Sequence, residues 1–149
     1  MAITQAIANA FKKQLLEGDV NLASGGDKFK LALYTSSATL NSATTAYTSS
    51  NEVGDSGAYS AGGGALTGQA TAIGSGTGAG VAYVDFADLS FTGVTLTARG
   101  ALIYNTSSAV TNAAVAVLDF GGDKTATSGT FTVQFPAFTT AAAILRISG

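Results

Sequence analysis

The chain has 149 residues, of which 46% are apolar, so it is long enough for one domain with a hydrophobic core and too apolar for global disorder. Only 11% of the residues are charged, against about 25% in ordinary domains, and the net charge is −2. The absence of Cys and His excludes a disulfide framework, the usual zinc and copper ligands, and a Ser-His-Asp triad. Seven scattered Lys and Arg argue against nucleic-acid binding. No apolar run reaches the ~18 residues of a membrane helix, and the first residues carry no basic leader, so we expect neither a membrane span nor a signal peptide.

One helix is predicted, over residues 3–17. Ile3, Ile7, Phe11 and Leu15 recur every four residues, and Gly18 is a natural stop. A helix this short must dock its apolar stripe. It either covers one open end of its own core, which we favour, or acts as an arm that docks on a neighbouring subunit.

Strands dominate the rest of the chain. Residues 28–35 alternate, with Phe29, Leu31 and Leu33 on one face and a solvated face that carries Lys28 and Lys30. Residues 36–56 are rich in Ser, Thr and Asn and predict a long surface loop with one short strand near 46–50, and loops of this length are often binding elements. Further strands are expected at 66–73, 81–86, 89–91, 94–96, 130–135 and 141–148, with turns at 74–80 and 121–129.

A β-hairpin over residues 97–120 is the feature around which the fold is organised. Apolar segments 101–104 and 113–120 flank the polar loop 105–112. Segment 113–120 is apolar on both faces except at Asp119, so it lies centrally in a sheet or under a partner. We therefore predict an all-β fold, a β-sandwich or jelly-roll-like barrel with one short N-terminal α-helix.

The domain organisation follows from this pattern. We expect one β-sandwich domain over residues 1–149, with the helix at 3–17 and the β core at 28–149, including the long loop 36–56. Assembly of several copies is also favoured. The low charge means that little self-repulsion opposes it, and segment 113–120, which is apolar on both faces, could be covered by a partner.

Candidate chemical sites are few. The glycines of segment 74–80 do not follow the G-x-G-x-x-G spacing and lead into no helix pattern, so a flexible turn is favoured over nucleotide binding. Two short carboxylate pairs, Asp85 with Asp88 and Asp119 with Asp123, are weak calcium candidates; local turn bonds are the favoured role. Neither a cofactor, a metal, a small-molecule substrate nor an enzymatic activity is predicted.

Arg99 interrupts a strand that is otherwise small and apolar. It occupies an edge or pairs with an aspartate, or else it contacts another subunit, where Arg is favoured. The sequence leaves these alternatives open.

Several segments of the sequence resemble those of a family of small virion structural proteins of tailed bacteriophages. They are MAITQAIANAFKKQLLEG, FKLALYTSSATL, AYTSSNEV, GVAYVDFAD, TARGALIYN, AVAVLDFGGDKTATSGTFTVQFPA and AILRI, and together they span nearly the whole chain. FKLALYTSSATL and the block from 97 to 136 are the most specific parts. No catalytic motif is among them, so the resemblance carries over no active-site residue.

The resemblance implies a capsid decoration, or cement, protein, present in many copies on the outside of the head. The expected partners are the major capsid protein and further copies of the chain, as a dimer or trimer; the expected location is the virion surface, after assembly in the bacterial cytoplasm. A tail-tube or tail-associated protein is the alternative, and a carbohydrate-binding β-sandwich that stacks sugars on Tyr47, Tyr59, Tyr83 and Tyr104 is a second one. The residues predicted to contact partners are Ile3, Ile7, Phe11, Tyr34, Tyr47, Asn51, Glu52 and Arg99.

Overall fold

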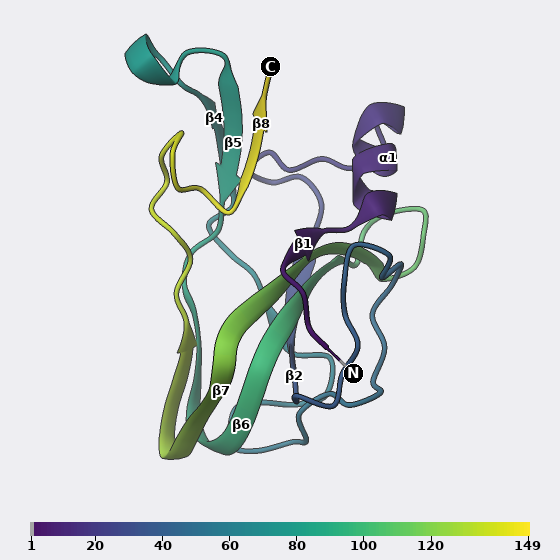
Figure 1. Cartoon of the computed structure of the whole chain (residues 1–149), viewed down its shortest axis with the longest axis vertical. Helices are drawn as coiled ribbons and strands as arrows, with labels where there is room; N and C mark the ends of the chain where they lie inside the picture. The colour runs from purple at the N-terminus through teal and green to yellow at the C-terminus, as the bar shows by residue number, and fades with distance from the viewer. Residues whose placement is uncertain (1) are drawn as a thin grey trace.

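The computed structural model describes residues 2–149. The elements in chain order are β1 (Ala6–Ile7), α1 (Asn9–Glu17), β2 (Phe29–Tyr34), β3 (Gly64–Ala65), β4 (Ala70–Ile73), the 3₁₀ helix η1 (Gly76–Gly78), β5 (Val81–Asp85), β6 (Leu89–Asn105), β7 (Ala113–Val133) and β8 (Leu145–Ser148). The chain is mostly β, with two antiparallel sheets and one short α-helix (Figure 1). Neither sheet closes on itself, so the all-β class is confirmed, while the sandwich or barrel arrangement stays a prediction.

The larger sheet has the strand order β1-β7-β6-β2-β3 and is organised around the β6–β7 hairpin. The two strands pair from Leu89 opposite Val133 to Asn105 opposite Ala113. The predicted hairpin is therefore confirmed, and residues 113–118 are buried between β6 and β1 as their two apolar faces require. Figure 1 shows the hairpin as a long diagonal ribbon below the small sheet.

The hairpin is longer than the sequence pattern predicts. Residues 121–129 were expected to form a turn, but they continue β7, which spans 21 residues. The turn formers in this segment instead make bulges, since Gly121 and Ser128 have positive φ angles of 76° and 46°. The separate strands expected at 89–91 and 94–96 likewise merge into β6, with Gly93 at another register shift.

The predicted helix is too long at its N-terminal end. Residues 3–7 are extended: Ile3 bridges Leu40, and Ala6 and Ile7 pair with Val117 and Ala116 on β7. Only Asn9–Glu17 is helical, and it ends at Gly18 in the left-handed conformation as predicted. The four-residue apolar spacing also covers residues 3–7, but the backbone of this segment makes its hydrogen bonds with neighbouring strands and not within a helix.

Strand β2 matches the predicted 28–35 strand, but only Lys28, at the start of its second face, is exposed. Ala32 and Tyr34 are fully buried, and Lys30 is half-buried. The loop 36–56 accounts for this burial because it folds back over the sheet: Tyr34 bridges Glu52, and the Val53 N–H donates to the Leu33 carbonyl over 2.9 Å. In the region where a short strand was expected, the structure has one isolated bridge, between Ala46 and Ala113.

The smaller sheet contains β4, β5 and β8 in that order, at the top of Figure 1. The glycine-rich segment 74–80 is the turn between β4 and β5, as predicted, and it includes η1. The outer strands β4 and β8 are shorter than the predicted 66–73 and 141–148, with bounds of Ala70–Ile73 and Leu145–Ser148. The β5 strand, at Val81–Asp85, matches its prediction closely.

Candidate functional site

The residues predicted to contact a partner fall into two groups in the structure. Ile3, Phe11 and Tyr34 are at most 6% exposed and pack inside the chain, so they offer no surface to a partner in this conformation. They are apolar because they belong to the hydrophobic core, where most apolar residues with a regular spacing lie. Asn51 is exposed, while the other four are half-buried: Ile7, Tyr47, Glu52 and Arg99.

Glu52 is the centre of a polar cluster that holds the loop 36–56 on the sheet. Its Oε2 accepts from the Tyr47 hydroxyl at 2.6 Å, and its Oε1 accepts from the Tyr59 hydroxyl at 2.8 Å and from the Gly62 N–H at 2.7 Å. Tyr59 also accepts from the Leu33 N–H at 2.8 Å, which ties the cluster to β2. One carboxylate therefore joins the loop 36–56 to Gly62 and, through Tyr59, to the β2 strand.

Two further tyrosines close this cluster. The Tyr104 hydroxyl donates to the Gly62 carbonyl over 2.5 Å, and its ring stacks on Tyr47 with centroids 4.8 Å apart. The Tyr34 hydroxyl donates to the Thr48 carbonyl over 2.6 Å. Burial raises the pKa of Tyr34, Tyr47, Tyr59 and Tyr104, because a phenolate would lose its hydration, and the nearby Glu52 charge raises each pKa further.

The same burial weakens the predicted sugar-stacking role of two tyrosines. Tyr59 is fully buried against Phe91, and Tyr104 is 3% exposed, so neither ring presents a free face to a ligand. Tyr83 packs on Phe138 with ring centroids 4.7 Å apart, on the small sheet. The four rings thus do not form one platform.

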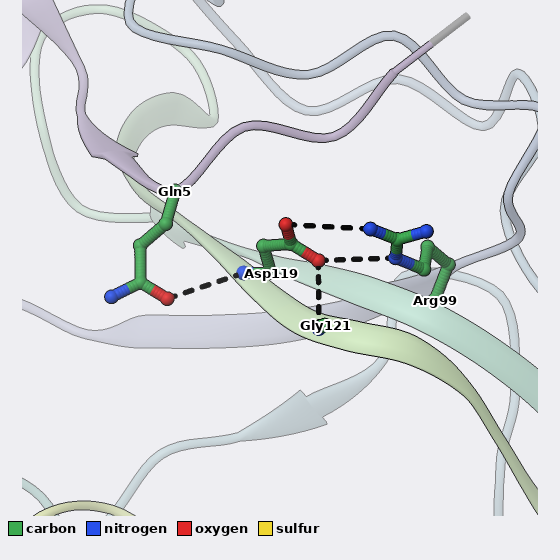
Figure 2. Close-up of polar contacts among 4 residues, drawn as sticks. All are labelled: Gln5, Arg99, Asp119 and Gly121. Carbon is green, nitrogen blue, oxygen red and sulfur yellow. Dashed lines mark hydrogen bonds and ion pairs between the residues drawn. The ribbon is translucent and has the colours of Figure 1, made fainter.

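Arg99 on β6 pairs with Asp119 on β7, the ion-pair alternative predicted for it (Figure 2). The Arg99 Nε donates to Asp119 Oδ1 at 3.1 Å, and the Gly121 N–H donates to the same oxygen at 2.9 Å. The Gln5 Oε1 accepts from the Asp119 N–H on the opposite side. The Arg99 guanidinium, followed by the Gly121 N–H, holds the pKa of Asp119 below its ordinary value.

A cavity of 490 Å³ opens beside this ion pair. Phe120, Phe131 and Phe135 contribute apolar walls, and its charged lining residues, Asp119 and Lys124, have opposite signs. Because Asp119 already pairs with Arg99, the groups that the cavity presents to a ligand are an apolar wall and the ammonium group of Lys124.

Of the four aspartates named as calcium candidates, Asp123 is exposed and the other three make separate local contacts. Asp85 accepts from the Phe86 N–H, Asp88 accepts from the Phe135 N–H at 2.9 Å, and Asp119 is used by Arg99. Within residues 2–149, no three Asp, Glu, His or Cys side chains gather as a metal site would need. Turn and strand-end bonds, the favoured role for Asp in such places, account for Asp85 and Asp88.

A larger groove, of 920 Å³, lies between α1 and the small sheet, and sequence reasoning did not find it. Leu16, Ile73 and Ile147 border it with exposed fractions of 91%, 79% and 62%. The alternation of β8 predicts one apolar face, with Leu145 and Ile147, but only the tertiary arrangement leaves Ile147 uncovered.

Comparison with protein-family models, with curated proteins and with solved structures finds no match to this chain. Over residues 2–149, no helix has both the length and the apolar character that crossing a membrane requires.

Proposed function

We propose that this chain is a structural protein of a tailed-bacteriophage virion, a decoration protein that binds the outer face of the major capsid shell. The full-length resemblance supports the assignment to a virion. The observation that carries the decoration role is the neutral, hydroxyl-rich outer half of the β6–β7 hairpin. In this role the two sheets act together as an open β-sandwich-like body.

The outer half of the hairpin has unusual surface chemistry. Segments 89–98 and 125–133 contain no charged residue. The exposed side chains along them are Ser90, Thr92, Thr95, Thr97, Thr125, Thr127, Ser128, Thr130 and Thr132. Two cross-strand hydroxyl pairs, Ser90 with Thr132 and Thr97 with Thr125, lie 2.8 Å apart.

Such a surface suits repeated contacts with a shell. Neutral hydroxyls lose less on desolvation than charges do, and they bond to whichever donor or acceptor the partner presents. A net charge of −2 adds little repulsion between neighbouring copies. Each contact is weak, but a dimer or trimer would multiply the contacts made by one adhering unit.

Binding to shells tests the proposal. Purified protein is mixed with capsid shells that lack it, and the shells are sedimented. The double variant Thr127→Lys with Thr130→Lys places two charges on the hairpin, and we expect at least a tenfold loss of binding, ~1.4 kcal/mol. Ser24→Lys, which changes an exposed hydroxyl in the 19–27 loop, is the matched control and should bind as the parent does.

Cryo-electron microscopy of the whole virion gives the decisive outcome. Density for this chain on the outer face of the shell is the expected result. Stacked rings along the tail would contradict the decoration role and favour a tail-tube protein. Particles that lack the chain would contradict both roles.

A further inference from the structure

A large bulge interrupts strand β7 beside the 490 Å³ cavity. The paired positions of the two hairpin strands pass directly from Gly100–Asp119 to Ala98–Lys124. Residues 120–123 are therefore extra residues on β7, which lie opposite a single residue of β6. Bulges re-aim the side chains around them and are common next to functional sites. Residues from both sides of this bulge line the cavity, so the bulge shapes its wall.

Lys124 is a cation on the face of the hairpin that otherwise forms core. It lies opposite Ala98, which is fully buried, and the following pair on that face, Leu96 with Ala126, is also buried. Directly opposed residues of antiparallel strands share a face, so the Lys124 side chain leaves β7 on the core side. It is nevertheless exposed and lines the cavity. The cavity therefore opens to solvent at a position where the core face carries a positive charge.

The other walls of the cavity are mostly apolar and in part aromatic. Phe120 and Phe131 stand with their ring centroids 6.1 Å apart, and Phe135 and Ile144 come from the C-terminal part of the chain. Phe120 and Ile144 are only half-buried, so part of this apolar surface is free. The volume of 490 Å³ falls within the range of about 300–1,000 Å³ that small-molecule sites have.

Lys124 supplies the charge that a ligand would meet in the cavity. Asp119, the other charged lining residue, points to Arg99, whose Nε donates to it over 3.1 Å (Figure 2). The negative charge of Asp119 is therefore compensated within the chain. Among residues 2–149, Lys13 and Arg99 are the cations that form ion pairs, so the Lys124 ammonium group keeps its charge for a ligand.

We propose that this cavity binds a small organic carboxylate with an aromatic body, which packs its ring against Phe120 and Phe131 and pairs its carboxylate with Lys124. Aromatic rings gain from offset and edge contacts with one another, beyond the burial of their area. An ammonium group and a carboxylate form a charge-assisted hydrogen bond. A neutral ligand of the same shape would make only the apolar contacts, and a cation would be repelled.

Purified protein is enough to test this inference, which is independent of the decoration role. The probe is cinnamate, and cinnamamide is the neutral ligand of the same shape. Titration of isotope-labelled protein, followed by two-dimensional NMR, gives both the affinity and the site. We expect saturable shifts of the Phe120, Lys124 and Phe131 amide signals, with a Kd of about 1 mM or lower for cinnamate. Cinnamamide should bind at least about threefold more weakly.

Reversal of the charge at Lys124 isolates the ion pair. Lys124→Glu should weaken cinnamate binding at least about threefold and leave the affinity for cinnamamide unchanged, because only cinnamate carries the charge. Lys28→Glu is the matched control, since Lys28 is also exposed but lies outside the lining of the cavity. Its affinity for both ligands should equal that of the parent.

Truncation of an aromatic wall tests the apolar part of the site. Phe120→Ala should weaken the binding of both ligands at least about threefold, because it removes apolar contact area that they share. Phe138→Ala is the matched control, since Phe138 is 42% exposed and packs on Tyr83 of the small sheet, away from the cavity lining. Circular dichroism checks that each variant is folded.

Several results would overturn the inference. They are the absence of saturable shifts up to about 5 mM cinnamate, equal affinities for cinnamate and cinnamamide, or cinnamate binding that Lys124→Glu leaves unchanged. An equal loss for both ligands in Lys124→Glu would assign the effect to altered structure. Shifts confined to Ile73 and Ile147 would place the acid in the groove between α1 and the small sheet instead. None of these results bears on whether the protein binds capsid shells.

Discussion

Glu52 concentrates three hydrogen bonds on one half-buried carboxylate. Tyr47 donates from within the loop 36–56, and Tyr59 and the Gly62 N–H donate from the segment that follows the loop. Hydrogen bonds to a charged group are stronger than neutral ones, and each donor left buried without an acceptor carries a further cost. Glu52 thus adds polar contacts to the apolar ones that Ala38, Leu40 and Val53 of the loop 36–56 make in the core.

Replacement of Glu52 by Ala should lower the free energy of unfolding by about 2–3 kcal/mol, because it leaves the Tyr47 hydroxyl and the Gly62 N–H without their acceptor. Urea unfolding followed by circular dichroism measures the loss. Asp55→Ala is the control, since Asp55 is exposed and accepts one bond, from the Ala61 N–H. A loss no larger than in this control would mean that Glu52 does not hold the loop.

The Arg99–Asp119 pair should contribute modestly and in a pH-dependent way. Both side chains are about one-third exposed, so Arg99→Gln should cost about 0.5 kcal/mol at pH 7. The folded pKa of Asp119 lies below its ordinary value of 3.8, so the pair stabilises the fold above about pH 4 and this stabilisation is lost as pH falls through the folded pKa. Urea unfolding at pH 7 and near pH 2 should show a difference at pH 7 only. An equal loss at both pH values would assign the effect to packing of the Arg99 side chain.

At the scale of elements, close approach between strands determines how the N-terminal segment packs. Gly100 on β6 lies opposite Asp119, and a Cβ placed there would overlap the Leu118 carbonyl and lie within 3.0 Å of Ile3 side-chain atoms. The extended segment of residues 3–7 can therefore lie on the hairpin only because Gly100 has no side chain. This contact replaces the first two turns of the predicted helix.

Gly100→Ala should destabilise the protein by about 1–3 kcal/mol through overpacking, and it should displace the N-terminal segment. Gly122→Ala is the matched control, because its Cβ would meet nothing within 4 Å and its φ is not positive. Thermal unfolding gives the stability, and hydrogen exchange at Ala8, whose N–H donates to the Val115 carbonyl, reports the displacement. Similar melting temperatures for the two variants would refute the close-approach argument.

At the scale of the whole molecule, four of the five tyrosines join the long loop to the larger sheet. Their folded pKa values are raised above 10.0, the value of an ordinary tyrosine, so the unfolded chain ionises first as pH increases. The stability contributed by these groups is complete below about pH 10 and is lost at higher pH.

An alkaline titration should therefore show cooperative behaviour. Tyr34, Tyr47, Tyr59 and Tyr104 should gain phenolate absorbance at 295 nm together with the loss of β-sheet circular dichroism, above pH 10. The parent in denaturant is the control and should titrate near pH 10. Ionisation of all four near pH 10 with the fold intact would contradict the burial of this cluster.

Much of the secondary structure could be predicted from the sequence because period-two alternation and turn residues act locally. The β6–β7 hairpin, the β5 strand and the Gly18 helix stop all follow from such local signals. The helix start and the 121–129 segment could not be predicted, because partner strands across the sheet compete with local preference and supply the deciding hydrogen bonds.

By itself, the sequence determined an all-β chain of low charge, with one helix and a central hairpin that is apolar on both faces. It also singled out Glu52 and Tyr47, though as partner contacts. Only the tertiary structure decided that Tyr34 and Phe11 are core residues, that Glu52 collects three donors, and that Ile73 and Ile147 remain uncovered in the groove between α1 and the small sheet. The physical reason is that alternation states which residues share a face, whereas burial depends on what the rest of the chain places over that face.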